Sequence, residues 1–239
     1  AIEESAFYNC DGLTEIQISN NITTIGNQAF NDCDKLESVT IPDSVTTLGL
    51  QAFYSCDALS TAIIGNNVKT IGSSTFSNCL NLTSVSIGNN VSSIGTNAFY
   101  QCKKLTDVTI GNGVTHIYDY AFQYCTSLKN ITLPNSLTFI GIRAFNGCSE
   151  LTTVTVGGNI AEIKDHAFSS CEKLTAFYGG LASEDNRCLI LNGNLRFFAQ
   201  YGITEYTIPE SVSTIGSQAF SSSKQLTSIT ISKNITNIE

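Results

Sequence analysis

The sequence has no Trp and no Met, only three Pro and two His, and charged residues make up just 13% of its 239 residues. No apolar run approaches the roughly 20 residues that a membrane-spanning helix needs. Twelve Lys and Arg stand against twenty Asp and Glu, for a net charge of −8, and the basic residues form no cluster. Because nucleic-acid binding needs a clustered basic surface, this composition argues against a nucleic-acid partner. The hydrophobic content of 42% favours a packed core over disorder.

Three residue types recur with a 23-residue period over eight units. The Phe positions are Phe7, Phe30, Phe53, Phe76, Phe99, Phe122, Phe145 and Phe168. Each is followed at the third position by a Cys, at Cys10, Cys33, Cys56, Cys79, Cys102, Cys125, Cys148 and Cys171. A Leu keeps the same step from Leu13 to Leu174. A fixed period of this length predicts a solenoid of stacked units.

Each unit contains two kinds of periodicity. Leu36, Val39 and Ile41 show the spacing of a short strand with one buried face. Phe53 and Cys56 are three positions apart, which is helical spacing, and residues suited to a helix N-cap precede the Ala-Phe pair in most units. These are Asn27, Ser73, Thr96, Asp119, Asp165 and Ser217. We therefore expect an α/β solenoid, a leucine-rich repeat with a parallel sheet on its concave face and short helical or 3-10 turns on its convex side.

The unit 36–58, LESVTIPDSVTTLGLQAFYSCDA, and its copies resemble the BspA-like leucine-rich repeats, which are related to the Treponema type. The resemblance covers essentially the whole chain. It implies a curved solenoid of the kind used by surface proteins of anaerobic bacteria and some protozoa, several of which are adhesins for host matrix proteins.

The regular 23-residue units run from position 13 to position 173, and an irregular 29-residue unit follows at 174–202. Its Asn192-Gly193 pair predicts a β-hairpin. A two-residue turn would pair Ile190 with Leu195 and Cys188 with Phe197, giving one apolar face. This face would pack on the solenoid as a non-standard repeat, although a projecting recognition hairpin is an alternative.

Regular units resume at 203–239, so the prediction is a single solenoid over residues 1–239. Both ends cut through a repeat, and we expect the chain to be a segment of a longer protein.

The spacing of the cysteines favours a ladder of buried, reduced thiols. Zinc sites use closely spaced ligands, whereas successive cysteines here are separated by a full 23-residue period. Disulfides are an open alternative, because stacked units bring their Cα atoms about 5 Å apart. His116 and His166 have no nucleophile placed beside them by a known motif, so we predict neither an enzyme, a metal site nor a cofactor.

Aromatic and Arg departures from the repeat are the candidate ligand-binding residues, since these types dominate binding hot spots. Tyr118 replaces the usual Gly of the unit. The candidates are Tyr100, Tyr118, Tyr120, Tyr124, Phe139 and Arg143, and in the irregular unit Tyr178, Arg196 and Phe198. The simpler alternative is that these rings pack over the edge of the solenoid.

The resemblance implies an extracellular domain, on the cell surface or secreted, that binds a host or extracellular-matrix protein or a glycan. That inference rests on likeness of fold, so two alternatives stay open: a structural spacer in a large surface protein, and an enzyme.

Overall fold

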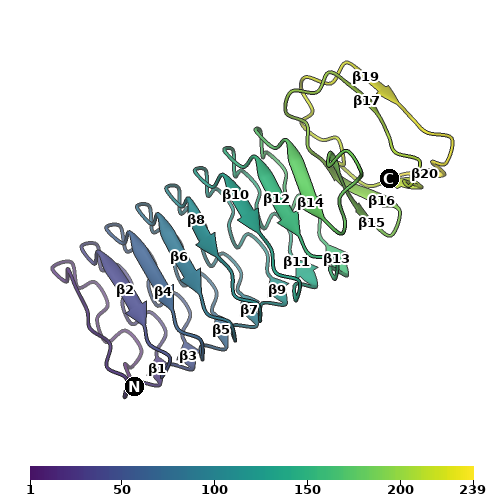
Figure 1. Ribbon diagram of the computed structural model, residues 1–239. Coiled ribbons are helices and arrows are strands. Elements are labelled where there is room, and N and C mark those ends of the chain that lie inside the picture. The colour runs from purple at the N-terminus through teal and green to yellow at the C-terminus, as the bar shows by residue number, and fades with distance from the viewer.

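The computed structural model describes residues 1–239 and contains twenty strands and no helix. Figure 1 shows the strands stacked coil upon coil along one axis, from the N-terminal end to the irregular region near β15 and β16. The fold is a parallel β-solenoid. The expectation of an α/β solenoid with helical or 3-10 turns is therefore wrong.

One side of the solenoid carries the longer strands. They are β2 (Ser38–Ile41), β4 (Thr61–Ile64), β6 (Ser84–Ile87), β8 (Asp107–Thr109), β10 (Asn130–Thr132), β12 (Thr153–Val156), β14 (Ala176–Gly179), β17 (Glu205–Thr207) and β19 (Ser228–Thr230). They pair in parallel as β2-β4-β6-β8, β10-β12-β14 and β17-β19. The parallel sheet expected on this face is thus present, but it is divided into three parts.

A second side carries two-residue strands. They are β1 (Thr24–Ile25), β3 (Thr47–Leu48), β5 (Thr70–Ile71), β7 (Ser93–Ile94), β9 (His116–Ile117), β11 (Phe139–Ile140), β13 (Glu162–Ile163), β18 (Thr214–Ile215) and β20 (Asn237–Ile238). Their first residues face solvent or are half-buried, and their second residues are buried except in β20. Neighbouring strands pair Thr24 with Thr47, Thr70 with Ser93 and Ser93 with His116, so the register follows the sequence repeat without a shift.

The third side, here called the turn face, consists of residues 27–34 and their equivalents in the other coils, and it replaces the predicted helix. Gln28 and Asp32 have positive φ values of 54° and 56°, and the same positions are left-handed in the other regular coils. A helix cannot contain a left-handed residue at every fourth position. The backbone instead bonds between coils: the Phe30 amide donates to the Ala52 carbonyl at 2.8 Å.

The Asn position that begins the turn face and the Gly position just before it also serve the next coil. The Asn27 Oδ1 accepts a hydrogen bond from the Leu50 amide at 2.9 Å, so this side chain caps its neighbour and not a helix of its own. A Cβ on Gly49 would lie 2.5 Å from the Asn27 backbone nitrogen. The Gly therefore permits close contact between coils.

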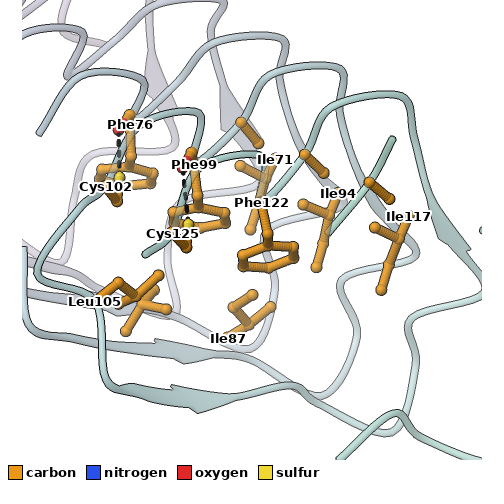
Figure 2. Packing of buried hydrophobic residues seen from close by; sticks show 14 of the residues in the cluster. Ile71, Phe76, Ile87, Ile94, Phe99, Cys102, Leu105, Ile117, Phe122 and Cys125 are labelled. Atoms are coloured by element: carbon orange, nitrogen blue, oxygen red, sulfur yellow. Dashed lines mark hydrogen bonds between the residues drawn. The ribbon is translucent and has the colours of Figure 1, made fainter. Parts of the chain in front are cut away.

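The interior is a column of stacked Phe rings from Phe7 to Phe168, with successive centroids 5.0 to 5.4 Å apart. Figure 2 shows part of it, with Ile71, Ile94 and Ile117 in a parallel row beside the rings. The Cys side chains have a specific role: the Cys102 thiol donates to the Phe76 carbonyl at 3.1 Å. Equivalent bonds are present from Cys33 to Cys171. All nine cysteines are free thiols, and eight of them are buried.

The hairpin of β15 (Cys188–Leu191) and β16 (Asn194–Phe198) interrupts this stack. Ile190 pairs with Leu195, but the register then shifts, so Cys188 pairs with Phe198 and Leu189 with Phe197. The predicted pairing of Cys188 with Phe197 is wrong, because an irregularity follows Leu189.

Both faces of the hairpin are buried as a result. Leu189 and Phe197 join the large core cluster of the preceding coils, whereas Cys188, Leu195 and Phe198 join a small cluster with the last coils. The hairpin thus lies between two hydrophobic cores, which differs from the single apolar face expected.

Candidate functional site

The clearest surface feature is an aromatic group at the corner between the short strands and the turn face. His116 begins β9, Phe139 begins β11 and Tyr118 follows β9. Their ring centroids are 5.7 Å apart for His116 and Tyr118, 5.7 Å for His116 and Phe139, and 5.9 Å for Tyr118 and Phe139. Ile142 and Arg143 come next in the coil of Phe139 and are exposed. We call these five residues the corner patch.

The corner patch stands out because no other coil has an aromatic ring at the positions of His116, Phe139 and Tyr118. The outward column of the short strands reads Thr24, Thr47, Thr70, Ser93, His116, Phe139 and Glu162. Tyr118 is 40% exposed although neighbouring aromatic rings surround it. One exposed and two half-buried rings, with an Arg that makes no ion pair in the same coil as Phe139, are the residue types of binding hot spots.

The other predicted tyrosines lie on the turn face and form a separate group. Tyr100 meets Tyr124 edge-on at 5.9 Å, at an interplanar angle of 66°. Tyr100 and Tyr120 also line a groove of about 490 Å³, together with Tyr54 of an earlier coil. The structure therefore divides the predicted cluster between two faces, and sequence analysis did not find Tyr54.

The candidates in the irregular unit do not form one patch. Tyr178 lies on β14 and is 44% exposed. The Arg196 guanidinium donates to the Ile163 carbonyl at 2.9 Å and to the Asp165 carboxylate at 3.2 Å, so it ties the hairpin to β13. Phe198 is buried, because the register shift turns it into the small core. Its prediction as a surface residue is wrong.

The largest hollow of the surface was not predicted. It measures about 820 Å³ and follows the carboxyl ends of β2, β4, β6 and β8. Thr40, Ile63 and Thr109 line one side of it, and Ile63 is 45% exposed. The hollow is also lined by a ladder of Asn and Asp residues in which each side-chain oxygen accepts from a backbone amide of the next coil, for example Asp43 from Asn66 and Asn66 from Asn89. These bonds explain the recurring Asn or Asp as a structural element.

One polar cluster near the hairpin has residue types that are used in catalysis. The Tyr206 hydroxyl lies 3.2 Å from the Cys188 thiol and donates to Asp185 at 2.9 Å, and Ser183 donates to Asp185 at 2.6 Å. Burial raises the pKa of the Cys188 thiol to about 12. Since the thiolate is the nucleophilic form, this thiol is unreactive at neutral pH, and the cluster instead fixes the loop before β15.

The ladder thiols are in the same state. Burial raises the pKa of the Cys33 and Cys148 thiols to about 12, and it raises the pKa of Cys79 and Cys102 as well. Each ladder thiol already donates its proton to a carbonyl of the preceding coil. No group of three or more His, Cys, Asp or Glu residues is arranged to hold a metal ion.

The 23-residue coils, the stacked Phe column and the close Gly contacts define a leucine-rich-repeat β-solenoid. The sequence profile described as "BspA type Leucine rich repeat region" matches residues 1–128, 92–179 and 193–239, in six copies. The chain belongs to this BspA-type leucine-rich repeat family. No curated protein matches the chain.

Several solved structures share the fold. A leucine-rich repeat protein from Bacteroides ovatus superimposes with a TM-score of 0.66 at 21% identity, covering 98% of this chain and 77% of that one. One from Eubacterium ventriosum gives a TM-score of 0.63 at 26% identity, covering 76% and 50% of the two chains.

A leucine rich cell surface protein from Faecalibacterium prausnitzii gives a TM-score of 0.58 at 24% identity, covering 91% and 60%. The chain thus corresponds to half or three-fifths of the length of two of these proteins. The structure has no helix that is long and apolar enough to span a membrane.

Proposed function

We propose that this chain is a ligand-binding repeat domain on the cell surface or in the secreted state, and that the corner patch contacts a partner protein, such as a host or extracellular-matrix protein. The observation that carries the proposal is the clustering of His116, Tyr118 and Phe139 at 5.7 to 5.9 Å on an exposed corner. Coil stacking does not require these rings, since other coils have Thr, Ser, Asn or Glu in place of His116 and Phe139 and mostly Gly in place of Tyr118.

Two further points support the proposal. The structurally similar F. prausnitzii protein is described as a leucine rich cell surface protein. The Arg143 side chain takes part in no ion pair, so its charge is available to a partner. Aromatic rings give contact area, and an Arg beside them gives direction to the contact.

The test is a binding screen of the protein against purified matrix proteins and glycans, followed by variants that restore the repeat. The double variant Tyr118→Gly and Phe139→Thr gives the corner the residues that are most common at these two positions in the other coils. We expect it to weaken protein binding at least tenfold, because a hot-spot aromatic is worth about 2 kcal/mol or more.

The matched control is Thr109→Ala with Thr132→Ala, on the long strands. Equal losses from both double variants would show that the regular strand face binds instead, and this would overturn the role of the corner. The alternative of a structural spacer predicts no binding partner in the screen and no effect of either variant beyond stability. An enzyme, the other alternative, would instead turn over a substrate.

A further inference from the structure

A second feature of the turn face is a row of tyrosines in alternate coils. Tyr8, Tyr54 and Tyr100 each follow the column Phe directly, and each is two coils from the next. The same position in the coils between them holds Asn31 and Ser77, which are 4% and 2% exposed. Tyr8 is 50% exposed, and Tyr54 and Tyr100 are partly exposed. Projecting rings therefore alternate with recessed polar residues along the solenoid axis.

The spacing of this tyrosine row follows from the core beneath it. The rings of Phe53, Phe76 and Phe99 follow one another at 5.3 and 5.4 Å (Figure 2 shows the latter two). Ring centroids two coils apart are therefore separated by about 11 Å, slightly more than twice the usual strand spacing. A rigid column fixes this repeat, so the row presents one aromatic ring every two coils.

Hydrogen bonds hold two of these rings in place. The side-chain amide of Asn78, in the next coil, donates to the Tyr54 hydroxyl at 2.9 Å. The Gln101 amide donates to the Tyr100 hydroxyl at 3.0 Å. Between the two rings lies the groove of about 490 Å³, which Ser77 also lines. The site is therefore partly preorganised, which lowers the entropy cost of binding.

The groove between Tyr54 and Tyr100 is lined by Tyr, Ser, Asn and Gln alone and has no charged residue. Tyr8 lies beside an acidic group: it interacts with the Asp32 carboxyl, whose pKa is raised by burial and by the neighbouring carboxylates of Asp34 and Asp11. Together with the net charge of −8, this argues against a polyanionic ligand such as a sulfated polysaccharide.

We propose that the tyrosine row binds an uncharged β-1,4-linked glycan along the solenoid axis. In such a chain every second pyranose presents the same face, so its two-sugar repeat matches the two-coil repeat of the rings. The C–H groups of that face pack on the negative face of a Tyr ring. The Asn and Gln amides can both donate to and accept from the sugar hydroxyls. The proposal adds a ligand class on a second face, and it stands or falls independently of the corner patch.

A proline-rich peptide also favours aromatic surfaces, but it docks into grooves lined by aromatic rings. Here Ser, Asn and Gln outnumber the three tyrosines that line the groove, and this suits a ligand that carries hydroxyl groups along its whole length.

The test is calorimetric titration of the intact protein with cellohexaose and with the hexasaccharide of β-1,4-linked N-acetylglucosamine. Each is compared with its disaccharide and with a β-1,3-linked glucose hexasaccharide. We expect at least one β-1,4-linked hexasaccharide to bind at least tenfold more tightly than its disaccharide and than the β-1,3 chain. The disaccharide is too short to contact two tyrosine rings, and the β-1,3 chain does not present the same sugar face at the two-coil spacing.

Variants locate the site. Tyr54→Ala with Tyr100→Ala should abolish the length dependence, whereas Tyr54→Phe with Tyr100→Phe keeps the rings and should retain most of the affinity. The matched control is Tyr201→Ala, an exposed tyrosine beyond the hairpin, which should leave binding unchanged. Protection of the buried thiols verifies that each variant is folded.

Three results would overturn the proposal. The first is no binding of either β-1,4 hexasaccharide at millimolar concentration, and the second is glycan binding that survives loss of both rings. The third is binding of a polyproline peptide, and of neither hexasaccharide, to the tyrosine row. Loss of matrix-protein binding by the corner variants, with glycan binding intact, would separate this site from the corner patch.

Discussion

At the scale of single residues, Phe99 shows how a coil is fixed in the stack. Its ring lies between Phe76 and Phe122 at 5.4 and 5.0 Å and is fully buried. Phe99→Ala should reduce the free energy of unfolding by roughly 3–5 kcal/mol, because it removes a buried ring and leaves a cavity between two rigid coils. Chemical denaturation measures this. A loss below about 1 kcal/mol would mean that the ring column carries little of the stability.

The thiols give a second prediction at this scale. Eight of the nine are buried and seven ladder thiols donate to carbonyl groups, while Cys10 is half-buried. Titration with a thiol reagent at neutral pH should detect about one fast group in the folded protein and all nine after denaturation. The expected fast group is Cys10, and Cys10→Ser should remove it. Disulfides found by mass spectrometry without reduction would contradict this prediction.

At the scale of elements, the comparison of sequence and structure is most instructive on the turn face. Phe53 and Cys56 are three positions apart. This spacing places both side chains on one face in a helix, and it does so equally in a segment of turns with left-handed residues, so the spacing alone does not distinguish the two. The decision depends on hydrogen bonds to the next coil, such as the bond from the Phe53 amide to the Thr75 carbonyl at 2.9 Å. The repeat period alone therefore predicts the stack and the core column but not the backbone of this face.

Because the repeat period does not predict the backbone of the turn face, it also predicts only part of the candidate site. Tyr118 and Phe139 are separated by slightly less than one 23-residue coil, so the period predicts that they come close, and they do. Tyr100 and Tyr124 were expected in the same cluster, yet they lie on the turn face, whose path was not predictable. Phe198 was misplaced because a register shift in the hairpin has no local sequence signal.

The loop before the hairpin gives a prediction of pH dependence. Burial of the Asp185 carboxyl acts to raise its pKa, but hydrogen bonds from Ser183, the Arg187 amide and Tyr206 outweigh it, and the pKa is lowered from 3.8. A lowered folded pKa stabilises the fold above the unfolded pKa, and the gain disappears as pH falls through the folded value.

Asp185→Asn should therefore cost about 1 kcal/mol at pH 7, a low figure because the carboxylate is largely exposed. The cost should vanish in strong acid. Denaturation of both proteins across the acid range measures it, with Glu184→Gln as the matched control. A cost that stays constant with pH would show that the charge of Asp185 does not matter.

At the scale of the whole molecule, the hairpin separates a core of 55 buried residues from a core of seven. Solenoid stability is the sum of coil and interface contributions, so coils with few buried neighbours open more easily. The last coils have both a small core and exposed apolar residues such as Ile229 and Ile238. Stability should consequently fall sharply across the hairpin and not gradually along the axis.

Amide hydrogen exchange tests this step directly. The amides of Phe53, Phe76 and Phe99, which bond to the next coil, should be the slowest to exchange. Amides within 203–239 should exchange roughly 30-fold faster or more, as expected for an opening free energy lower by about 2 kcal/mol.

Val91 and Val212 occupy the same position of the repeat, one in each core, and both are fully buried. Val212→Ala should speed exchange only in the coils beyond the hairpin. Val91→Ala should speed exchange only in the coil of Val91 and the coils next to that one, because each coil contacts its neighbours alone. Equal exchange on both sides of the hairpin, or an effect of Val212→Ala on the Phe76 amide, would show that the solenoid opens as one cooperative unit.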